Sequence, residues 1–129
     1  MPEGARRVLL AEDDRFLRRA AEARLRRHGL EVLTAVDGEE ALRLARSERL
    51  DLVLLDVVMP KLDGFEVLKL LKEDAATASI PVIVLSNLGQ DRDVALAKTL
   101  GAVAYLVKAN LSLQDLVDRV DAALSTGTA

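Results

Sequence analysis

Residues 52–60 read LVLLDVVMP, and this stretch decides the fold of the 129-residue chain. Four consecutive apolar residues without polar alternation are typical of a strand covered on both faces. One carboxylate, Asp56, ends the run. Similar apolar runs occur at Val8–Ala11, Val32–Val36, Val82–Leu85 and Ala102–Val107. The sequence therefore predicts five short strands.

Segments with the period of an amphipathic helix follow each of these runs. Their apolar stripes lie at Leu17–Leu25, Ala41–Ala45, Val67–Leu71, Val94–Leu100 and Leu113–Leu124. Gly29 is expected as the C-cap of the first helix. Asp37 with Glu40, and Ser112 with Asp115, have the spacing of helix-capping pairs.

Strands that alternate with helices imply right-handed crossovers and a parallel sheet. We therefore expect an α/β fold: a doubly wound, flavodoxin-like (βα)5 parallel sheet in the order 2-1-3-4-5, with helices on both faces. Residues 1–129 are expected to form a single domain, with a core over about residues 6–124. Residues 125–129 are expected to form a polar tail.

The composition excludes several classes of protein. No cysteine is present, which excludes disulfides, thiolate chemistry and cysteine-based zinc sites. A net charge of −3 gives no overall attraction to nucleic acid or anionic membranes. The apolar run behind Arg6 and Arg7 is too short for a signal peptide or a membrane span. We expect a cytoplasmic protein that binds neither nucleic acid nor membrane directly.

Polar side chains gather where four of the predicted strands end. Open α/β sheets place their sites at this edge. The residues concerned are Glu12, Asp13 and Asp14 after the first strand, Asp56 after the third, Ser86 after the fourth and Lys108 after the fifth.

The acidic residues at this edge indicate a metal site. Asp56 alone could simply cap the following turn, but a partly buried carboxylate is costly without a cation or hydrogen-bond donors. Several carboxylates together call for a hard divalent cation, and Mg²⁺ fits best, with Mn²⁺ as a substitute. Glu12 and Asp13 are expected to bind it. Asp14 is better explained by the positive end of the following helix.

Lys108 and Ser86 complete a set suited to phosphoryl transfer. Taken singly, they would be a solvated lysine and a turn serine. Together with a metal and a carboxylate nucleophile, they suit attack of Asp56 on phosphorus. Lys108 would then neutralise one phosphoryl oxygen and Ser86 would hydrogen-bond another.

At these residues, and over essentially its whole length, the sequence resembles response-regulator receiver domains of two-component signalling, in particular the chemotaxis-regulator-like single domains. The matching segments are LLAED at 9–13, DVVMPKLDG at 56–64, Ser86 and YLVK at 105–108. The resemblance implies that Asp56 accepts a phosphoryl group from a phosphohistidine on a sensor kinase. It also implies that Asp13 and Asp56 bind the metal directly, Glu12 through water and Val58 through its backbone carbonyl.

The resemblance further implies a conformational switch. Ser86 would move toward the new phosphoryl group and Tyr105 would turn into the vacated space, remodelling the surface of the fourth helix, fifth strand and fifth helix. The implied partners are a sensor histidine kinase or phosphotransfer protein, and a downstream protein target or output domain. The chain would be a monomer or a weak phosphorylation-dependent dimer, and a stand-alone receiver is favoured over an excised domain.

Three departures from the family pattern stand near the site. Ala109 replaces the usual proline, which is typically in cis, so that either the site supports a strained bond or the loop differs. Asn87 either crowds the phosphoryl group or donates to it. Val57, Val58 and Leu88 offer no group that orients water, and slow self-dephosphorylation is expected.

Three other functions compete with that of a phosphorylated receiver. A haloacid-dehalogenase-type phosphatase needs an acid two residues after the nucleophile, where this chain has Val58. A flavin-binding module favours a hydroxyl- and glycine-rich loop and stacking aromatics, but aromatic residues make up 2% of this chain. The serious alternative is a degenerate, non-phosphorylated receiver that acts only as an interaction module. The chain is otherwise expected to catalyse only its own phosphoryl transfer and slow self-dephosphorylation.

Overall fold

The computed structural model describes residues 5–59, 61, 63–87 and 89–126. Five strands form one sheet in the order β2-β1-β3-β4-β5, and all neighbouring pairs are parallel. The strands are β1 (Arg7–Ala11), β2 (Glu31–Ala35), β3 (Leu52–Asp56), β4 (Val82–Ser86) and β5 (Ala104–Val107). The predicted fold class and strand order are confirmed.

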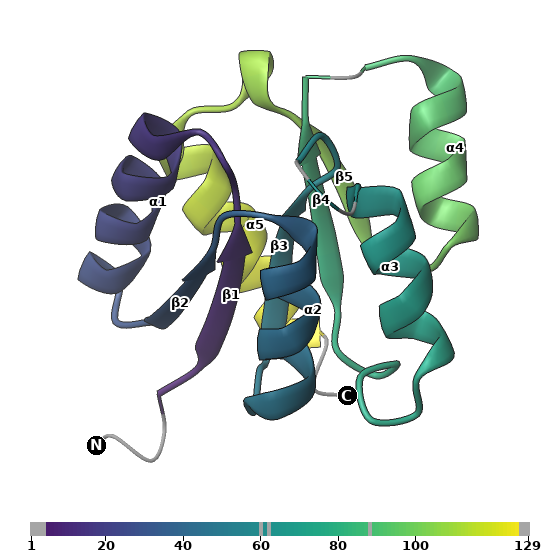
Figure 1. Ribbon diagram of the computed structural model, residues 1–129. Helices are drawn as coiled ribbons and strands as arrows, with labels where there is room; N and C mark the ends of the chain where they lie inside the picture. Colours follow the sequence, from purple (N-terminus) through teal and green to yellow (C-terminus); the bar gives the residue numbers. More distant parts are fainter. Residues whose placement is uncertain (1–4, 60, 62, 88, 127–129) are drawn as a thin grey trace.

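Helices cover both faces of the sheet (Figure 1). They are α1 (Arg15–Arg27), α2 (Gly38–Ser47), α3 (Gly64–Glu73), α4 (Asp91–Thr99) and α5 (Leu113–Thr126). One apolar cluster joins the sheet to α1 and α5, and a second joins it to α2, α3 and α4. Every residue of β3 and β4 is buried, because these central strands have a helix layer on each side.

Neither edge strand covers the whole of its predicted apolar run. Val36 lies beyond β2 and is 44% exposed, and Val103 precedes β5 and is 58% exposed. At an edge strand, apolar residues can continue past the last paired position, so that an apolar run overestimates the strand. In the central strands the run and the pairing agree.

The predicted helix ends are confirmed in their main features. Gly29 has φ +92°, and Leu30 N–H donates to the Leu25 carbonyl at 3.2 Å, which closes α1 one residue beyond its cap His28. Asp37 caps α2 by accepting from Glu40 N–H at 2.8 Å. Ser112 and Asp115 bond reciprocally at the start of α5.

α4 has little buried surface, and α5 runs further along the chain than predicted. Ala97 is the one buried residue of α4, and the N-cap Gln90 makes no side-chain capping bond. α5 extends to Thr126, so the first two residues of the predicted polar tail continue the helix, while residues 127–129 lie outside the described range. None of the described helices is long and apolar enough to cross a membrane.

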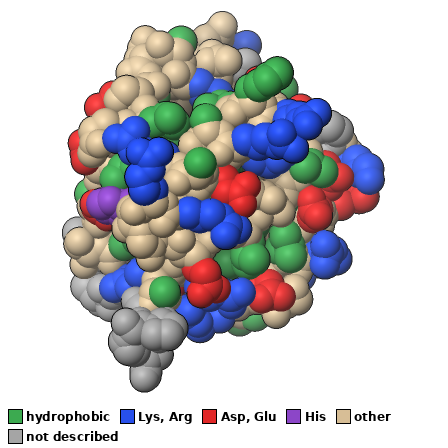
Figure 2. Space-filling model, turned by 90° about the vertical axis from the view of Figure 1, so that its left-hand side faces the viewer, with side chains coloured by type: hydrophobic (Ala, Val, Ile, Leu, Met, Phe, Trp, Pro, Cys, Tyr) green, Lys and Arg blue, Asp and Glu red, His purple; other side chains and the backbone are tan. Residues whose placement is uncertain are grey.

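Basic side chains gather on the face covered by α1, as Figure 2 shows. Arg15, Arg19, Arg26 and Arg27 are all exposed on this helix. The acidic pocket described next lies at the end of the sheet from which α1 starts.

Candidate functional site

An acidic pocket opens at the carboxyl edge of the sheet. Its walls are Glu12, Asp13, Asp14, Asp56, Val58, Asn87 and Lys108. Carboxylate oxygens from Glu12, Asp13 and Asp56 all lie within 4.8 Å of one another. The structure therefore brings together residues from the ends of three different strands. They are Glu12, Asp13 and Asp14 after β1, Asp56 at the end of β3 and Lys108 after β5.

Asp56 ends β3 and is 3% exposed. Its Oδ1 accepts a hydrogen bond from Val58 N–H at 2.9 Å, and its Oδ2 accepts one from Lys108 Nζ at 2.7 Å. Each carboxylate oxygen thus has one fixed donor. The side chain is held in place although it is almost fully withdrawn from water.

Gly64, at the start of α3, presses against the backbone of Asp56. A Cβ at this position would lie 2.3 Å from Val57 Cα and 2.5 Å from the Asp56 carbonyl oxygen. Gly64 N–H also donates to the Val57 carbonyl at 3.0 Å. Glycine is therefore required for α3 to start this close to the end of β3.

Glu12 is the most buried carboxylate of the pocket, at 1% exposure. Its Oε2 accepts from Asp14 N–H at 3.0 Å. Its Oε1 lies 2.6 Å from Lys108 Nζ, but no donor in the described part of the chain is aligned with it as a hydrogen bond requires. Burial raises the pKa of Glu12 to about 7, although the Lys108 contact and the Asp14 amide oppose this rise.

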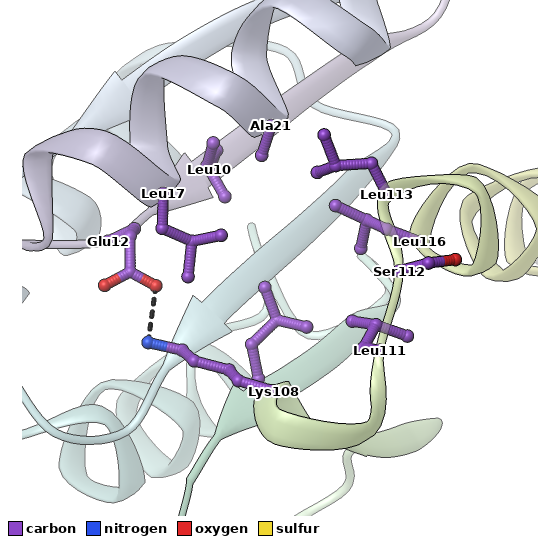
Figure 3. Close-up of a pocket in the computed structure, with 10 residues that line it drawn as sticks. Leu10, Glu12, Leu17, Ala21, Lys108, Leu111, Ser112, Leu113 and Leu116 are labelled. Atoms are coloured by element: carbon purple, nitrogen blue, oxygen red, sulfur yellow. Dashed lines mark ion pairs between the residues drawn. The ribbon is translucent and has the colours of Figure 1, made fainter.

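Lys108 reaches from the end of β5 to both Glu12 and Asp56. Figure 3 shows the Lys108 side chain extending toward Glu12, with which it forms an ion pair. An apolar cavity of about 80 Å³ adjoins the pair. Burial alone would lower the pKa of Lys108, but its contacts with Asp56 and Glu12 outweigh burial and raise it. The apolar cavity wall comprises Leu10, Leu17, Ala21, Leu85, Leu111, Leu113 and Leu116.

Asp13 and Asp14 have different roles in the structure. The Asp13 carboxylate is exposed, and within the described residues it has no hydrogen bond or ion pair. Asp14 instead caps α1, because its Oδ1 accepts from Leu17 N–H at 3.0 Å. The prediction that Asp14 serves the helix start is confirmed.

The residues of the pocket fit a divalent cation. Three carboxylates converge, the Asp13 side chain is available, and the buried Glu12 Oε1 lacks an aligned donor. Hard cations such as Mg²⁺ prefer such oxygen ligands. Val58 lines the same pocket, and participation of its carbonyl stays a prediction.

Ser86 and Tyr105 lie together but outside the wall of the pocket. Ser86 is fully buried at the end of β4, and its side chain hydrogen-bonds with that of Tyr105. Burial raises the pKa of Tyr105, and the bond with Ser86 partly offsets this. Tyr105 packs against the cluster that includes α4 residue Ala97. A bond between Ser86 and a phosphoryl group stays a prediction.

The loop after Lys108 differs from the usual family pattern. The described backbone contains no cis peptide bond, and Lys108–Asn110 form a 3₁₀ turn with Ala109 in trans. Asn87 is exposed and lines the pocket. Val58 is 56% exposed at the pocket, Val57 is buried, and Leu88 lies outside the described residues.

Sequence reasoning assigned no role to Arg18 or Gly64. Arg18 donates to the backbone carbonyls of Glu12 and Asp13 at 3.0 and 3.2 Å. An arginine on the first turn of the helix that follows the acids was a usable signal. The close approach of Gly64 depends on how α3 meets β3, and the sequence gives no sign of it beyond the glycine itself.

The chain matches the response regulator receiver domain family over residues 8–121. The gliding motility regulatory protein of Myxococcus xanthus is 43% identical over 115 residues, covering 89% of this chain and 15% of that protein. Protein PilH of Pseudomonas aeruginosa is 40% identical over 102 residues, covering 79% of this chain and 84% of PilH.

A solved structure agrees with these matches. A chain of the CheX–CheY–BeF₃–Mg²⁺ complex from Borrelia burgdorferi superposes with a TM-score of 0.86 at 29% identity, covering 95% of this chain and 92% of that one. The chain spans 42% of a probable transcriptional regulator of Cyanophora paradoxa and 15% of the Myxococcus protein. It belongs to the response regulator receiver domain family of two-component signalling, whose members are signalling modules rather than conventional enzymes.

Proposed function

We propose that this receiver is a phosphorylation-activated switch in which Asp56 accepts a phosphoryl group from a phosphohistidine of a sensor kinase. The observation that carries the proposal is the convergence at Asp56. Its carboxylate lies within 4.8 Å of the ligand oxygens of Glu12 and Asp13, and 2.7 Å from Lys108 Nζ. A degenerate receiver would lack part of this set.

In the proposed reaction, a carboxylate oxygen of Asp56 forms the new O–P bond while the N–P bond of the phosphohistidine breaks. The imidazole nitrogen keeps the electron pair of that bond and is protonated as it leaves. The Lys108 ammonium lies close enough to Asp56 to neutralise one oxygen of a phosphoryl group bound there. Ser86 would donate its hydroxyl to another oxygen after a local movement.

The pocket residues assign the cation ligands of the proposal. Asp13 and Asp56 would bind Mg²⁺ directly, Glu12 would act through water, and the Val58 carbonyl would complete the protein ligands, with Mn²⁺ able to substitute. When bound, Mg²⁺ supplies positive charge between the carboxylates and the incoming phosphoryl oxygens. The Borrelia complex contains BeF₃ and Mg²⁺, which supports a Mg²⁺ site in this receiver.

The response to phosphorylation would pass from Ser86 to Tyr105 and then to the surface of α4, β5 and α5. Two observations support this path. Tyr105 already bonds with Ser86, and α4 is anchored by a single buried residue, Ala97. A downstream protein target or an output domain would read this surface, and the phosphoryl donor would be a sensor histidine kinase or a phosphotransfer protein.

Beryllofluoride with Mg²⁺ tests the proposal, because this anion occupies the place of a phosphoryl group on a carboxylate. Tyr105 is the single tyrosine and the chain has no tryptophan, so its fluorescence reports on the switch alone. We expect a change in Tyr105 fluorescence and in amide spectra of α4 and β5.

The change should disappear with EDTA and in Asp56→Asn. Glu73→Gln, which alters an exposed carboxylate at the end of α3, is the matched control and should respond as the wild type does. An equal response in Asp56→Asn, or none in the wild type, would rule out the proposed switch.

A further inference from the structure

We propose that Arg18 is a positioning residue for the cation site: it braces the turn that carries Glu12 and Asp13, and so raises the affinity for Mg²⁺ without touching the ion. This inference rests on the proposed function, because it assumes that the acidic pocket binds a divalent cation.

The guanidinium of Arg18 bonds to the backbone of both acids. Its Nη1 donates to the Glu12 carbonyl at 3.0 Å and to the Asp13 carbonyl at 3.2 Å. These carbonyls lie where the chain leaves the sheet, just after Glu12 N–H makes a bond of 3.0 Å with the Ala35 carbonyl. Beyond this last hydrogen bond to the sheet, the Arg18 side chain therefore fixes the backbone of the turn.

Further bonds fix the same turn from within. Asp14 N–H donates to Glu12 Oε2 at 3.0 Å, and the Asp14 carboxylate accepts from Leu17 N–H. The backbone N–H of Arg18 bonds to the Asp14 carbonyl at 2.9 Å. Arg18 thus connects α1 to the turn through both its backbone and its side chain. Loss of the guanidinium would free the carbonyls of the two acids.

Positioning and simple electrostatics predict opposite effects for Arg18. Its positive charge repels a cation, so removal of the charge alone would tighten Mg²⁺ binding. Removal of a brace loosens the ligand geometry and weakens binding, since groups that orient metal ligands are commonly worth about 10–100-fold in affinity. The sign of the change therefore separates the two explanations.

Arg19 is the matched control. It lies on the same turn of α1 and carries the same charge, but it is exposed and makes no hydrogen bond or ion pair with any described residue. Arg19→Met changes the charge near the pocket without changing the brace.

The experiment measures the Mg²⁺ dissociation constant by isothermal titration calorimetry for the wild type, Arg18→Met, Arg18→Lys and Arg19→Met. Arg18→Met should bind Mg²⁺ about tenfold more weakly than the wild type, whereas Arg19→Met should bind as tightly or slightly more tightly. Labelling of Asp56 by acetyl phosphate in Arg18→Met should approach the wild-type rate at saturating Mg²⁺, because the defect lies in ion binding.

Thermal unfolding without metal shows whether each variant is folded. If Arg18→Met does not fold, Arg18→Lys decides, because it keeps the charge but its ammonium ends one bond short of the Nη1 that donates to both carbonyls. This variant should still bind Mg²⁺ more weakly. Wild-type affinity in Arg18→Lys, or affinity in Arg18→Met equal to that of Arg19→Met, would overturn the role of Arg18 alone. A wild type that binds no Mg²⁺ would overturn both this inference and the proposed function.

Discussion

Asp56 and Glu12 are both buried carboxylates, but they differ in the hydrogen-bond donors that their oxygens receive. Asp56 has a donor for each oxygen, whereas Glu12 has an aligned donor for Oε2 alone within the described structure. The sequence predicted that both would lie at one sheet edge. It could not predict the burial of Glu12, because the leucines that exclude water there come from distant segments, including Leu85 and Leu116.

The raised pKa of Glu12 predicts that Mg²⁺ affinity depends on pH. Below its pKa of about 7, Glu12 is mainly protonated in the metal-free protein, and a cation must displace that proton. Affinity should therefore fall as the pH is lowered from about 8 to about 6, with protons released on binding.

Titrations with Mg²⁺ across this range provide the check. Glu12→Gln should bind more weakly and lose most of the pH dependence. A flat profile in the wild type would mean that Glu12 does not titrate in the way its burial requires.

The apolar side chain of Val58 leads us to expect a long-lived phosphoryl group on Asp56. It lines the pocket and is 56% exposed, and it offers no hydrogen-bonding group to orient an attacking water. The lifetime of phosphorylated Asp56 should therefore shorten in Val58→Asn, measured as loss of acid-labile phosphate in Mg²⁺.

Val103→Asn is the control, since this valine is equally exposed, at 58%, but lies before β5 and away from the pocket wall. It should leave the lifetime unchanged. A wild-type lifetime as short as seconds would contradict the expectation.

At the scale of elements, apolar runs predicted β3 and β4 well, because these strands are buried along their whole length. The same runs overestimated the edge strands at Val36 and Val103. Helix ends were predictable where a local pair defines them, as with Ser112 and Asp115. The backbone contacts of Arg18 and the approach of Gly64 depend on tertiary geometry, and no local pattern encodes them.

Lys72 ties together three elements. Its Nζ donates to the carbonyls of Ala78 and Ile80 at 3.0 and 2.6 Å, in the loop between α3 and β4. Its stem fills the space beside Gly101, where a Cβ would lie 3.1 Å from Lys72 Cγ. Burial lowers the pKa of this lysine. Lys72 therefore fastens the turn after α4 to α3.

Lys72→Met keeps much of the stem but leaves two carbonyls without their donor. The free energy of unfolding should fall by about 1–3 kcal/mol. Lys69→Met, on an exposed position of the same helix, should change it little. Urea denaturation of the two variants makes the comparison, and equal stability would mean that the bonds of Lys72 contribute nothing net.

In the whole molecule, two apolar layers cover the faces of the sheet, while its carboxyl edge is polar. The set of site residues was predictable from the sequence because parallel strands end at the same edge. The inward pairing of Ser86 with Tyr105, the trans bond at Ala109 and the weak anchoring of α4 required the structure.

Locating the phosphoryl label tests whether Asp56 is the phosphoryl acceptor. Protein incubated with acetyl phosphate and Mg²⁺ is reduced with borohydride, which converts an aspartyl phosphate to homoserine, and its peptides are then analysed by mass spectrometry. We predict homoserine at position 56, and none when EDTA replaces Mg²⁺. Conversion at another carboxylate, or none at position 56 in the presence of Mg²⁺, would show that Asp56 is not the phosphoryl acceptor.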